Sequence, residues 1–178
     1  MTIKIKDKAF VPFINEKQLK QKITQVGAQI TQDFSGKDVV LLGVLNGSFM
    51  FMADLCRSIE LPVPCTFVKI SSYQGTKSSE KVTGLLGIQE NLENKNVIIV
   101  EDIIDTGISM DHMLKQIYAL NPASVSLVTL LFKPEAFRFN YPIDYVCFEI
   151  PNKFVVGYGL DYDGLGRNLK EIYQLDTP

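Results

Sequence analysis

Continuous apolar runs alternate with amphipathic stretches along most of the chain. Apolar runs of strand length lie at residues 38–45, 65–71, 82–88, 96–102, 124–132 and 144–150, with a shorter one at 153–159. Apolar side chains recur every three or four residues elsewhere, which predicts a helix that begins after Asn15 and is closed by Gly36, and further helices over 47–60 and 107–120. Strand, helix and strand repeated in this order are typical of an α/β protein with a mostly parallel central sheet and helices on both faces.

Length and composition limit the classes of protein that fit. The 178 residues suit one domain over residues 1–178, and 46% hydrophobic with 21% charged residues is typical of a folded globular chain. The net charge of −2 gives no general affinity for nucleic acid. The three cysteines contain no CxxC pair, which argues against a zinc ribbon or a disulfide framework. With no signal peptide and no apolar run of about 18 residues, we expect a cytoplasmic protein without a membrane partner.

The least apolar connector, SSYQGTKSSEK at residues 71–81, has no strand or helix period. A polar stretch between two strands can be a long hairpin turn. It can also be a flexible lid that carries one useful aromatic side chain, Tyr73. The pattern of residues leaves both interpretations open.

Three carboxylates crowd at the end of one predicted strand. In VIIVEDIIDTG, Glu101, Asp102 and Asp105 follow four apolar residues. Like charges repel one another, and packing gains nothing from them. Ligands bind at the carboxyl ends of strands in an open parallel sheet, so these acids mark a candidate site. They can accept hydrogen bonds from sugar hydroxyls, directly or through a magnesium ion, or they can form an acidic helix-capping cluster.

The helix that follows these acids offers an anion site. Its first turn presents free backbone N–H groups at the positive end of the helix dipole, from Thr106, Gly107, Ile108 and Ser109. Gly107 lets a ligand approach the backbone, and the hydroxyls of Thr106 and Ser109 add two donors. Acids beside a phosphate cradle are appropriate for a phosphorylated sugar.

The same stretch resembles the phosphoribosyl-diphosphate-binding motif of the type I phosphoribosyltransferases, in which apolar residues, two acids and two apolar residues precede Asp-Thr-Gly. Four further segments are similar, in the same order, to the hypoxanthine-guanine phosphoribosyltransferase family: VLNGSFMFMADL (44–55), SSYQGT (71–76), LFKPEA (131–136) and EIPNKFVVGYGLDYDGLGRNL (149–169). The motif with the acids identifies only the superfamily, whereas the last segment points to the 6-oxopurine enzymes.

The resemblance implies a fold and a reaction. The fold is that of the type I phosphoribosyltransferases, with a small hood formed by the N-terminal segment and the C-terminal region and a flexible loop at about residues 71–82. The reaction is purine salvage: transfer of the 5-phosphoribosyl group from phosphoribosyl diphosphate to hypoxanthine, guanine or both, giving IMP or GMP and pyrophosphate. Family members use Mg²⁺ and are usually homodimers or homotetramers. The ranking of hypoxanthine, guanine and xanthine does not follow from the sequence.

The resemblance also assigns roles within the acid-rich motif. Glu101 and Asp102 match the ribose-hydroxyl and magnesium positions of the family, where negative charge favours an oxocarbenium-like transition state. Asp105 matches the catalytic carboxylate beside the imidazole nitrogen of the base, where it can take or share a proton. Residues 105–109 match the cradle for the monophosphate.

Residues from the later segments match the base and diphosphate contacts of the family. Lys133 matches the lysine that donates to the exocyclic oxygen of the purine, Phe154 the ring that stacks on the base, and Val155 a backbone contact to its edge. Asp161 matches an acid for a second magnesium, and Arg167 an arginine that reaches pyrophosphate. Without the resemblance, Lys133 is a snorkelling surface lysine and Phe154 a core residue. Asp161 and Arg167 are then ordinary surface charges.

Two loops complete the correspondence. Leu45, Asn46 and Gly47 match the pyrophosphate loop, in which a cis peptide bond is typical of the family. Ser72 and Tyr73 match the loop that closes over the reacting sugar. Many members carry lysine at the position of Asn46, so asparagine here removes a cation from the pyrophosphate pocket or from a subunit contact.

Two other classes of protein fit parts of the sequence. A phosphoacceptor receiver domain has acids at strand ends and a lysine after a later strand, but its phosphoacceptor lies on a different strand from its acid pair. An RNA-binding regulator with the same fold and residual uracil transferase activity needs a basic face, which 18 basic against 20 acidic residues do not support. His112 is the single histidine, so a multi-histidine metal site is excluded. It lies off the apolar face of its predicted helix.

Overall fold

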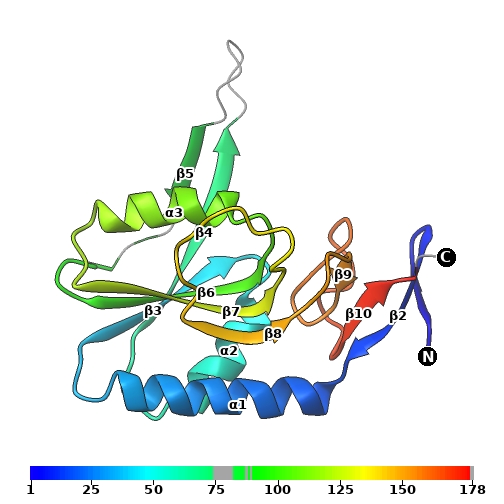
Figure 1. Ribbon diagram of the computed structural model, residues 1–178, viewed down its shortest axis with the longest axis horizontal. Helices are drawn as coiled ribbons and strands as arrows, with labels where there is room; N and C mark the ends of the chain where they lie inside the picture. Colours follow the sequence, from blue (N-terminus) through cyan, green and yellow to red (C-terminus); the bar gives the residue numbers. More distant parts are fainter. Residues whose placement is uncertain (74–81, 87, 89, 177–178) are drawn as a thin grey trace.

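The computed structural model describes residues 1–73, 82–86, 88 and 90–176. Its main element is a six-stranded sheet in the order β5-β4-β3-β6-β7-β8 (Figure 1). Neighbouring strands are parallel from β4 (Cys65–Tyr73) through β3 (Val39–Leu45), β6 (Asn96–Ile104) and β7 (Ser124–Phe132) to β8 (Tyr145–Glu149). β5 (Val82–Leu86) pairs antiparallel with β4 at the edge. The mostly parallel sheet that the sequence predicts is confirmed.

Helices cover both faces of this sheet. α1 (Glu16–Asp33) and α2 (Phe49–Ser58) lie on one face, and α3 (Ile108–Tyr118) lies on the other (Figure 1). Successive residues of a strand point to opposite faces, so Leu41 joins the cluster under α1 and α2 and Leu42 joins the cluster under α3. Because both faces are buried, the parallel strands read as continuous apolar runs rather than alternating ones.

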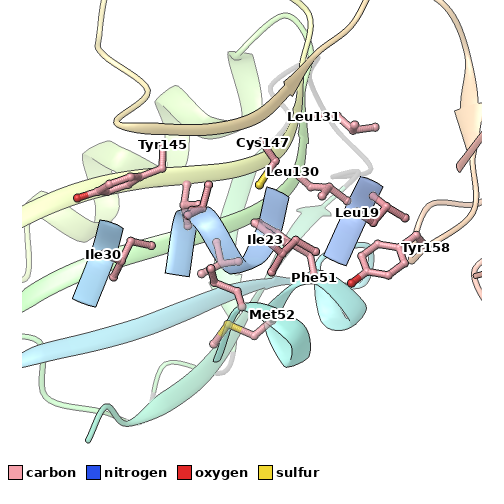
Figure 2. Packing of buried hydrophobic residues seen from close by; sticks show 14 of the residues in the cluster. Leu19, Ile23, Ile30, Phe51, Met52, Leu130, Leu131, Tyr145, Cys147 and Tyr158 are labelled. Carbon is pink, nitrogen blue, oxygen red and sulfur yellow. The ribbon is translucent and has the colours of Figure 1, made fainter. Parts of the chain in front are cut away.

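The larger cluster packs the helices against the sheet. Figure 2 shows Leu19, Ile23 and Ile30 of α1 with Phe51 of α2, and each of these side chains is at most 1% exposed. Burying an aliphatic side chain of this size contributes roughly 1.5–3 kcal/mol to stability. The apolar stripe of α1 therefore fixes this helix on the sheet.

The start of α1 agrees with the sequence, but its end does not. Asn15 caps the helix, because its Oδ1 accepts from Gln18 N at 2.9 Å while Gln18 Oε1 accepts from Asn15 N at 3.0 Å. The last helical residue is Asp33, three residues before Gly36, and Phe34 is the C-cap, whose backbone N donates to Ile30 O at 3.0 Å.

Other boundaries differ from the predicted ones by a few residues. The predicted helices 47–60 and 107–120 are shortened to α2 and α3. β6 runs through Glu101 and Asp102 to Ile104, because pairing with β7 continues to Phe132. The strand therefore extends two residues beyond the predicted run 96–102, and the acid pair lies inside it rather than at its end. The run 153–159 keeps only β9 (Val155–Val156), since residues 157–159 all have positive φ.

A second, antiparallel sheet contains both ends of the chain. Its order is β1 (Ile3–Ile5), β2 (Lys8–Ile14), β10 (Ile172–Leu175) and β9, and the two termini lie near it (Figure 1). It corresponds to the small hood that the resemblance implies. The apolar pattern predicted β9 but not β1, β2 or β10, in part because Pro12 interrupts β2. Pro12 pairs with Tyr173 beside a register shift, where the missing N–H is tolerated.

The predicted flexible loop at 71–82 falls mainly on residues 74–81, which lie outside the described residues. Its first three residues belong to β4, and Val82 begins β5. The description of residues 1–178 as one domain stays a prediction. In the described part of the chain, no helix is long and apolar enough to cross a membrane.

Candidate functional site

The strand order places a topological switch point between β3 and β6. Along the chain the parallel strands follow one another as β3, β4, β6, β7 and β8, whereas β3 lies between β4 and β6 in the sheet. The direction in which the chain crosses the sheet therefore reverses between β3 and β6. Ligands bind outside the carboxyl ends of the strands at such a switch point. The loop 45–47 and the segment 105–109 leave the sheet there.

Gly47 brings the first loop against the acid pair. A Cβ atom on Gly47 would lie only 1.5 Å from Asp102 Oδ2, so the carboxylate occupies the space that any side chain would need. The peptide bond between Leu45 and Asn46 is cis, as the resemblance implies. Asn46 is exposed, and Leu45 is half-buried. Loop 45–47 and β6 are thus in direct contact.

Glu101 and Asp102 form an electrostatically strained pair. Burial, followed by the neighbouring charge of Asp102, raises the pKa of Glu101 well above its usual value. Burial also raises the pKa of Asp102, although Oδ1 accepts from Ile103 N at 2.9 Å and the charge of Arg167 acts in the opposite direction. A cation or a set of hydroxyl donors at this point would stabilise both carboxylates.

The helix N-terminus beside the pair forms a small cavity of about 160 Å³, lined by Glu101 and residues 103–110. Gly107, with φ +82°, precedes α3, and the first helical hydrogen bond runs from Asp111 N to Gly107 O at 2.9 Å. The earlier N–H groups of the helix therefore have no helical acceptor, and that of Ile108 donates to Thr106 Oγ1 at 3.5 Å. Thr106 is half-buried, and Ile108 and Ser109 are exposed. The cavity lies at the helix N-terminus that the sequence predicts as an anion cradle, and the binding of an anion there stays a prediction.

Two aromatic residues that the sequence analysis missed contact Gly107 at the start of this helix. Tyr141 Oη donates to Gly107 O at 2.9 Å, and a Cβ on Gly107 would lie 2.6 Å from the Phe137 ring. Both residues come from the connection after β7. Their alternation with Phe139 in an otherwise polar loop was the available signal, but nothing in it names Gly107 as the partner.

Lys133 is a buried cation rather than a snorkelling surface lysine. It is 6% exposed, and its Nζ lies 2.8 Å from Asp105 Oδ2 and 3.4 Å from Asn152 Oδ1. Its own backbone N donates to Ile104 O at 3.0 Å, which fixes the residue beside the end of β6. Asp105 and Lys133 are therefore brought together at the mouth of the cradle. The sequence analysis missed Asn152.

Phe154 is not a core residue, because 44% of it is exposed. Its ring contacts Tyr162 edge-on, with centroids 5.9 Å apart, and Phe10 at 6.3 Å. Val155 is buried at the start of β9. Asn152, a hydrogen-bond partner of Lys133, precedes Phe154 by two residues, so the exposed aromatic ring follows closely in sequence after a contact of the buried lysine.

Asp161 and Arg167 form an ion pair rather than two separate surface charges. Arg167 Nη2 lies 2.5 Å from Asp161 Oδ1, and Arg167 Nη1 donates to Gly159 O at 2.6 Å. A Cβ on Gly159 would lie 2.1 Å from Gly47 O. The segment that carries Arg167 therefore packs directly on loop 45–47.

The chemistry of the donors fits magnesium. Mg²⁺ binds through one or two carboxylates and completes its octahedron with water and substrate phosphates. Glu101 and Asp102 supply one such pair, and Asp161, held by Arg167, is a separate carboxylate. Over residues 1–73, 82–86, 88 and 90–176, no three acidic, histidine or cysteine side chains are placed to hold one ion. The predicted ligands thus do not form a single cage.

The remaining residues that the sequence analysis named are Ser72, Tyr73 and His112. Ser72 and Tyr73 end β4, where they pair with Thr83 and Val82 of β5, and only their backbone is described. His112 is exposed on α3, as its place in the sequence predicts.

Known proteins resemble this chain over nearly its whole length. The family model described as "Phosphoribosyl transferase domain" matches residues 14–163. The hypoxanthine-guanine phosphoribosyltransferase of Dictyostelium discoideum is 40% identical over 165 residues, covering 90% of this chain and 92% of that protein. The hypoxanthine phosphoribosyltransferase of Escherichia coli K12 is 41% identical over 162 residues, covering 89% and 91%.

Solved structures agree with the sequence comparison. A crystal structure of a hypoxanthine-guanine phosphoribosyltransferase from Bacillus anthracis is 39% identical, with a TM-score of 0.85, and the match covers 94% of this chain and 97% of that one. The sheet, the cradle after β6 and these matches lead to one conclusion. The chain belongs to the phosphoribosyltransferase family, in the group that contains the hypoxanthine and hypoxanthine-guanine phosphoribosyltransferases.

Proposed function

We propose that the protein is a purine salvage enzyme that transfers the 5-phosphoribosyl group from phosphoribosyl diphosphate to hypoxanthine, guanine or both. The products are IMP or GMP and pyrophosphate. One observation carries the choice of base: Lys133 and Asp105 place a donor and an acceptor 2.8 Å apart beside the cradle. A 6-oxopurine offers the complementary groups, an exocyclic oxygen and an imidazole N–H. The names of the similar proteins point to the same bases.

The base-binding part of the proposal uses four residues. Lys133 donates to the exocyclic oxygen, and Asp105 takes or shares the imidazole proton as nucleophilic attack begins. Phe154 stacks on the base with its exposed face, and Val155 contacts the base edge through its backbone. In this scheme the Lys133–Asp105 ion pair is exchanged for contacts with the base, so that neither charge is left without a partner.

The sugar phosphate occupies the edge between β3 and β6. The 5-phosphate accepts from the backbone N–H groups of residues 106–109 at the start of α3 and from the hydroxyl groups of Thr106 and Ser109. Glu101 and Asp102 accept from the ribose hydroxyls, and their negative charge stabilises the oxocarbenium-like transition state. Ser72 and Tyr73, at the end of β4, would cover the sugar and exclude water.

The leaving pyrophosphate lies against loop 45–47 and Arg167. Glu101 and Asp102 would hold one Mg²⁺ ion, and Asp161 would hold a second. Bound magnesium supplies positive charge that offsets the charge of the diphosphate. The backbone of Leu45, Asn46 and Gly47 then orients the departing oxygens, and Arg167 adds a charged donor. Location in the cytoplasm and assembly as a homodimer or homotetramer are part of the same proposal.

A panel of bases tests this function. The protein is incubated with phosphoribosyl diphosphate, Mg²⁺ and adenine, hypoxanthine, guanine, xanthine or uracil, and nucleotides are separated by chromatography. We expect IMP, GMP or both. Nucleotide from uracil alone would instead support the RNA-binding regulator. Absence of transfer, together with labelling of one aspartate by acetyl phosphate, would support a receiver domain.

A further inference from the structure

Tyr158 lies in a stretch of backbone that an L-amino acid rarely adopts. Gly157, Tyr158 and Gly159 have φ values of +101°, +50° and +102°. Glycine adopts positive φ freely, whereas a residue with a Cβ needs support from its surroundings. Tyr158 is the one member of the three with a side chain, so its side chain is where that support can act.

The side chain of Tyr158 is anchored in the core and on α2. Only 7% of the residue is exposed, and the ring belongs to the cluster that contains Leu19 and Phe51 (Figure 2). Its hydroxyl donates to Asp54 Oδ2, and Arg57 binds the other oxygen of the same carboxylate. Burial, with the bond to Asp54, raises the pKa of Tyr158, so the hydroxyl remains a donor at neutral pH.

The bond between Tyr158 and Asp54 connects α2, which follows loop 45–47, with the segment that carries Arg167. α2, which carries Asp54, begins two residues after Gly47. On the other side, Gly159 follows Tyr158 directly, packs against Gly47 O and accepts from Arg167 Nη1 at 2.6 Å. A shift of Tyr158 would therefore move Gly159 away from Gly47 and carry Arg167 with it.

We propose that Asp54 and Tyr158 are a positioning pair for pyrophosphate. This inference rests on the function proposed above, in which neither side chain contacts a ligand. Their hydrogen bond holds the segment 157–167 against loop 45–47, and so keeps Arg167 at the distance from this loop that a bound diphosphate requires. Loss of the bond weakens pyrophosphate binding and leaves the base-binding residues unchanged.

A second tyrosine offers a matched control. Tyr145 is also 7% exposed and belongs to the same core cluster, and its hydroxyl donates to Asp33 Oδ2 at 2.8 Å. Tyr145 begins β8, and Asp33 ends α1. This bond therefore lies at the amino ends of the strands, whereas the candidate site lies at their carboxyl ends. Tyr145→Phe and Tyr158→Phe thus remove the same chemical group from equally buried rings.

Calorimetric titration with magnesium pyrophosphate tests the proposal. A lost hydrogen bond to a charged acceptor changes an equilibrium constant by about tenfold or more, so Tyr158→Phe should weaken pyrophosphate binding by about that factor. Tyr145→Phe should bind like the wild type. Asp54→Asn keeps an acceptor oxygen and should retain affinity, whereas Asp54→Ala should lose it. The KM for hypoxanthine should stay unchanged in all four variants.

Equal affinities of Tyr158→Phe and the wild type would overturn the proposal. So would equal losses in Tyr158→Phe and Tyr145→Phe, because a general loss of stability would then explain both. If Tyr158→Phe does not fold, the two substitutions at Asp54 decide the question. Failure of the proposed function is seen separately, as absence of nucleotide formation by the wild-type protein with every base.

Discussion

The ion pair between Lys133 and Asp105 is unequal in burial, which predicts unequal effects on stability. The side chain of Lys133 is 8% exposed and that of Asp105 is 44% exposed. Asp105→Asn keeps an acceptor oxygen but removes the negative charge, so the buried ammonium group is left with neutral acceptors only, among them Asn152 at 3.4 Å. Lys133→Met removes the buried charge, and Asp105 can turn its carboxylate to water.

The magnitudes follow from these surroundings. Removing one partner of a fully buried ion pair costs about 3–5 kcal/mol. Because Asp105 is half exposed and Asn152 remains, we expect about 1–3 kcal/mol for Asp105→Asn, and less than about 1 kcal/mol for Lys133→Met. For a chain of this size the first value corresponds to a fall in melting temperature of roughly 2–12 °C.

Differential scanning calorimetry measures both variants against a surface control. Lys115 Nζ and Asp111 Oδ2 are also 2.8 Å apart, but the lysine side chain is 70% exposed. Lys115→Met and Asp111→Asn should each change stability by no more than about 0.5 kcal/mol. An Asp105→Asn variant as stable as the wild type, or equal losses in Asp105→Asn and Lys133→Met, would refute the reasoning that Lys133 is a buried cation in need of a charged partner.

Three further predictions concern the site. In Gly47→Ala the new methyl group would displace the Asp102 carboxylate by more than roughly 1 Å. A misplacement of roughly 1 Å can lower activity by about 10²-fold, so steady-state kcat/KM should fall by at least that factor. Wild-type kinetics would contradict the contact between Gly47 and Asp102. Phe154→Ala should leave the melting temperature nearly unchanged because the ring is 44% exposed, but raise the KM for the base by about tenfold. An unchanged KM would exclude stacking. Excess chelator should abolish nucleotide formation and added Mg²⁺ should restore it, whereas full turnover in chelator would exclude a metal requirement.

The sequence predicted those parts of the fold that have a local pattern. The apolar face of α1 and the continuous run of β6 repeat over many residues, so their positions follow from periodicity. Strand ends do not, since β6 continues to Ile104 only because β7 supplies a partner. β2 was missed because Pro12 hides its alternation, and the bulge that accommodates Pro12 depends on β10.

The candidate site likewise has a part that the sequence predicts and a part that it does not. The cradle before α3 could be predicted because acids, glycine and hydroxyls are neighbours in the sequence. The pairing of Lys133 with Asp105 and Asn152, and of Tyr158 with Asp54, joins residues separated by up to 104 positions. No local pattern specifies such a partner. The resemblance gave Lys133 and Asp105 their roles, but not their mutual contact.

Competition between two bases is the most direct test of the proposed reaction. Equal concentrations of hypoxanthine and adenine are incubated with the protein, phosphoribosyl diphosphate and Mg²⁺, and IMP and AMP are quantified by chromatography. If Lys133 donates to an exocyclic oxygen, the amino group of adenine offers this buried cation no acceptor on the base. Such a mismatch can cost a factor of about 10⁴–10⁵, so IMP should form with AMP below about one part in 10⁴. Comparable amounts of AMP and IMP would contradict both the assignment of Lys133 and the 6-oxopurine specificity.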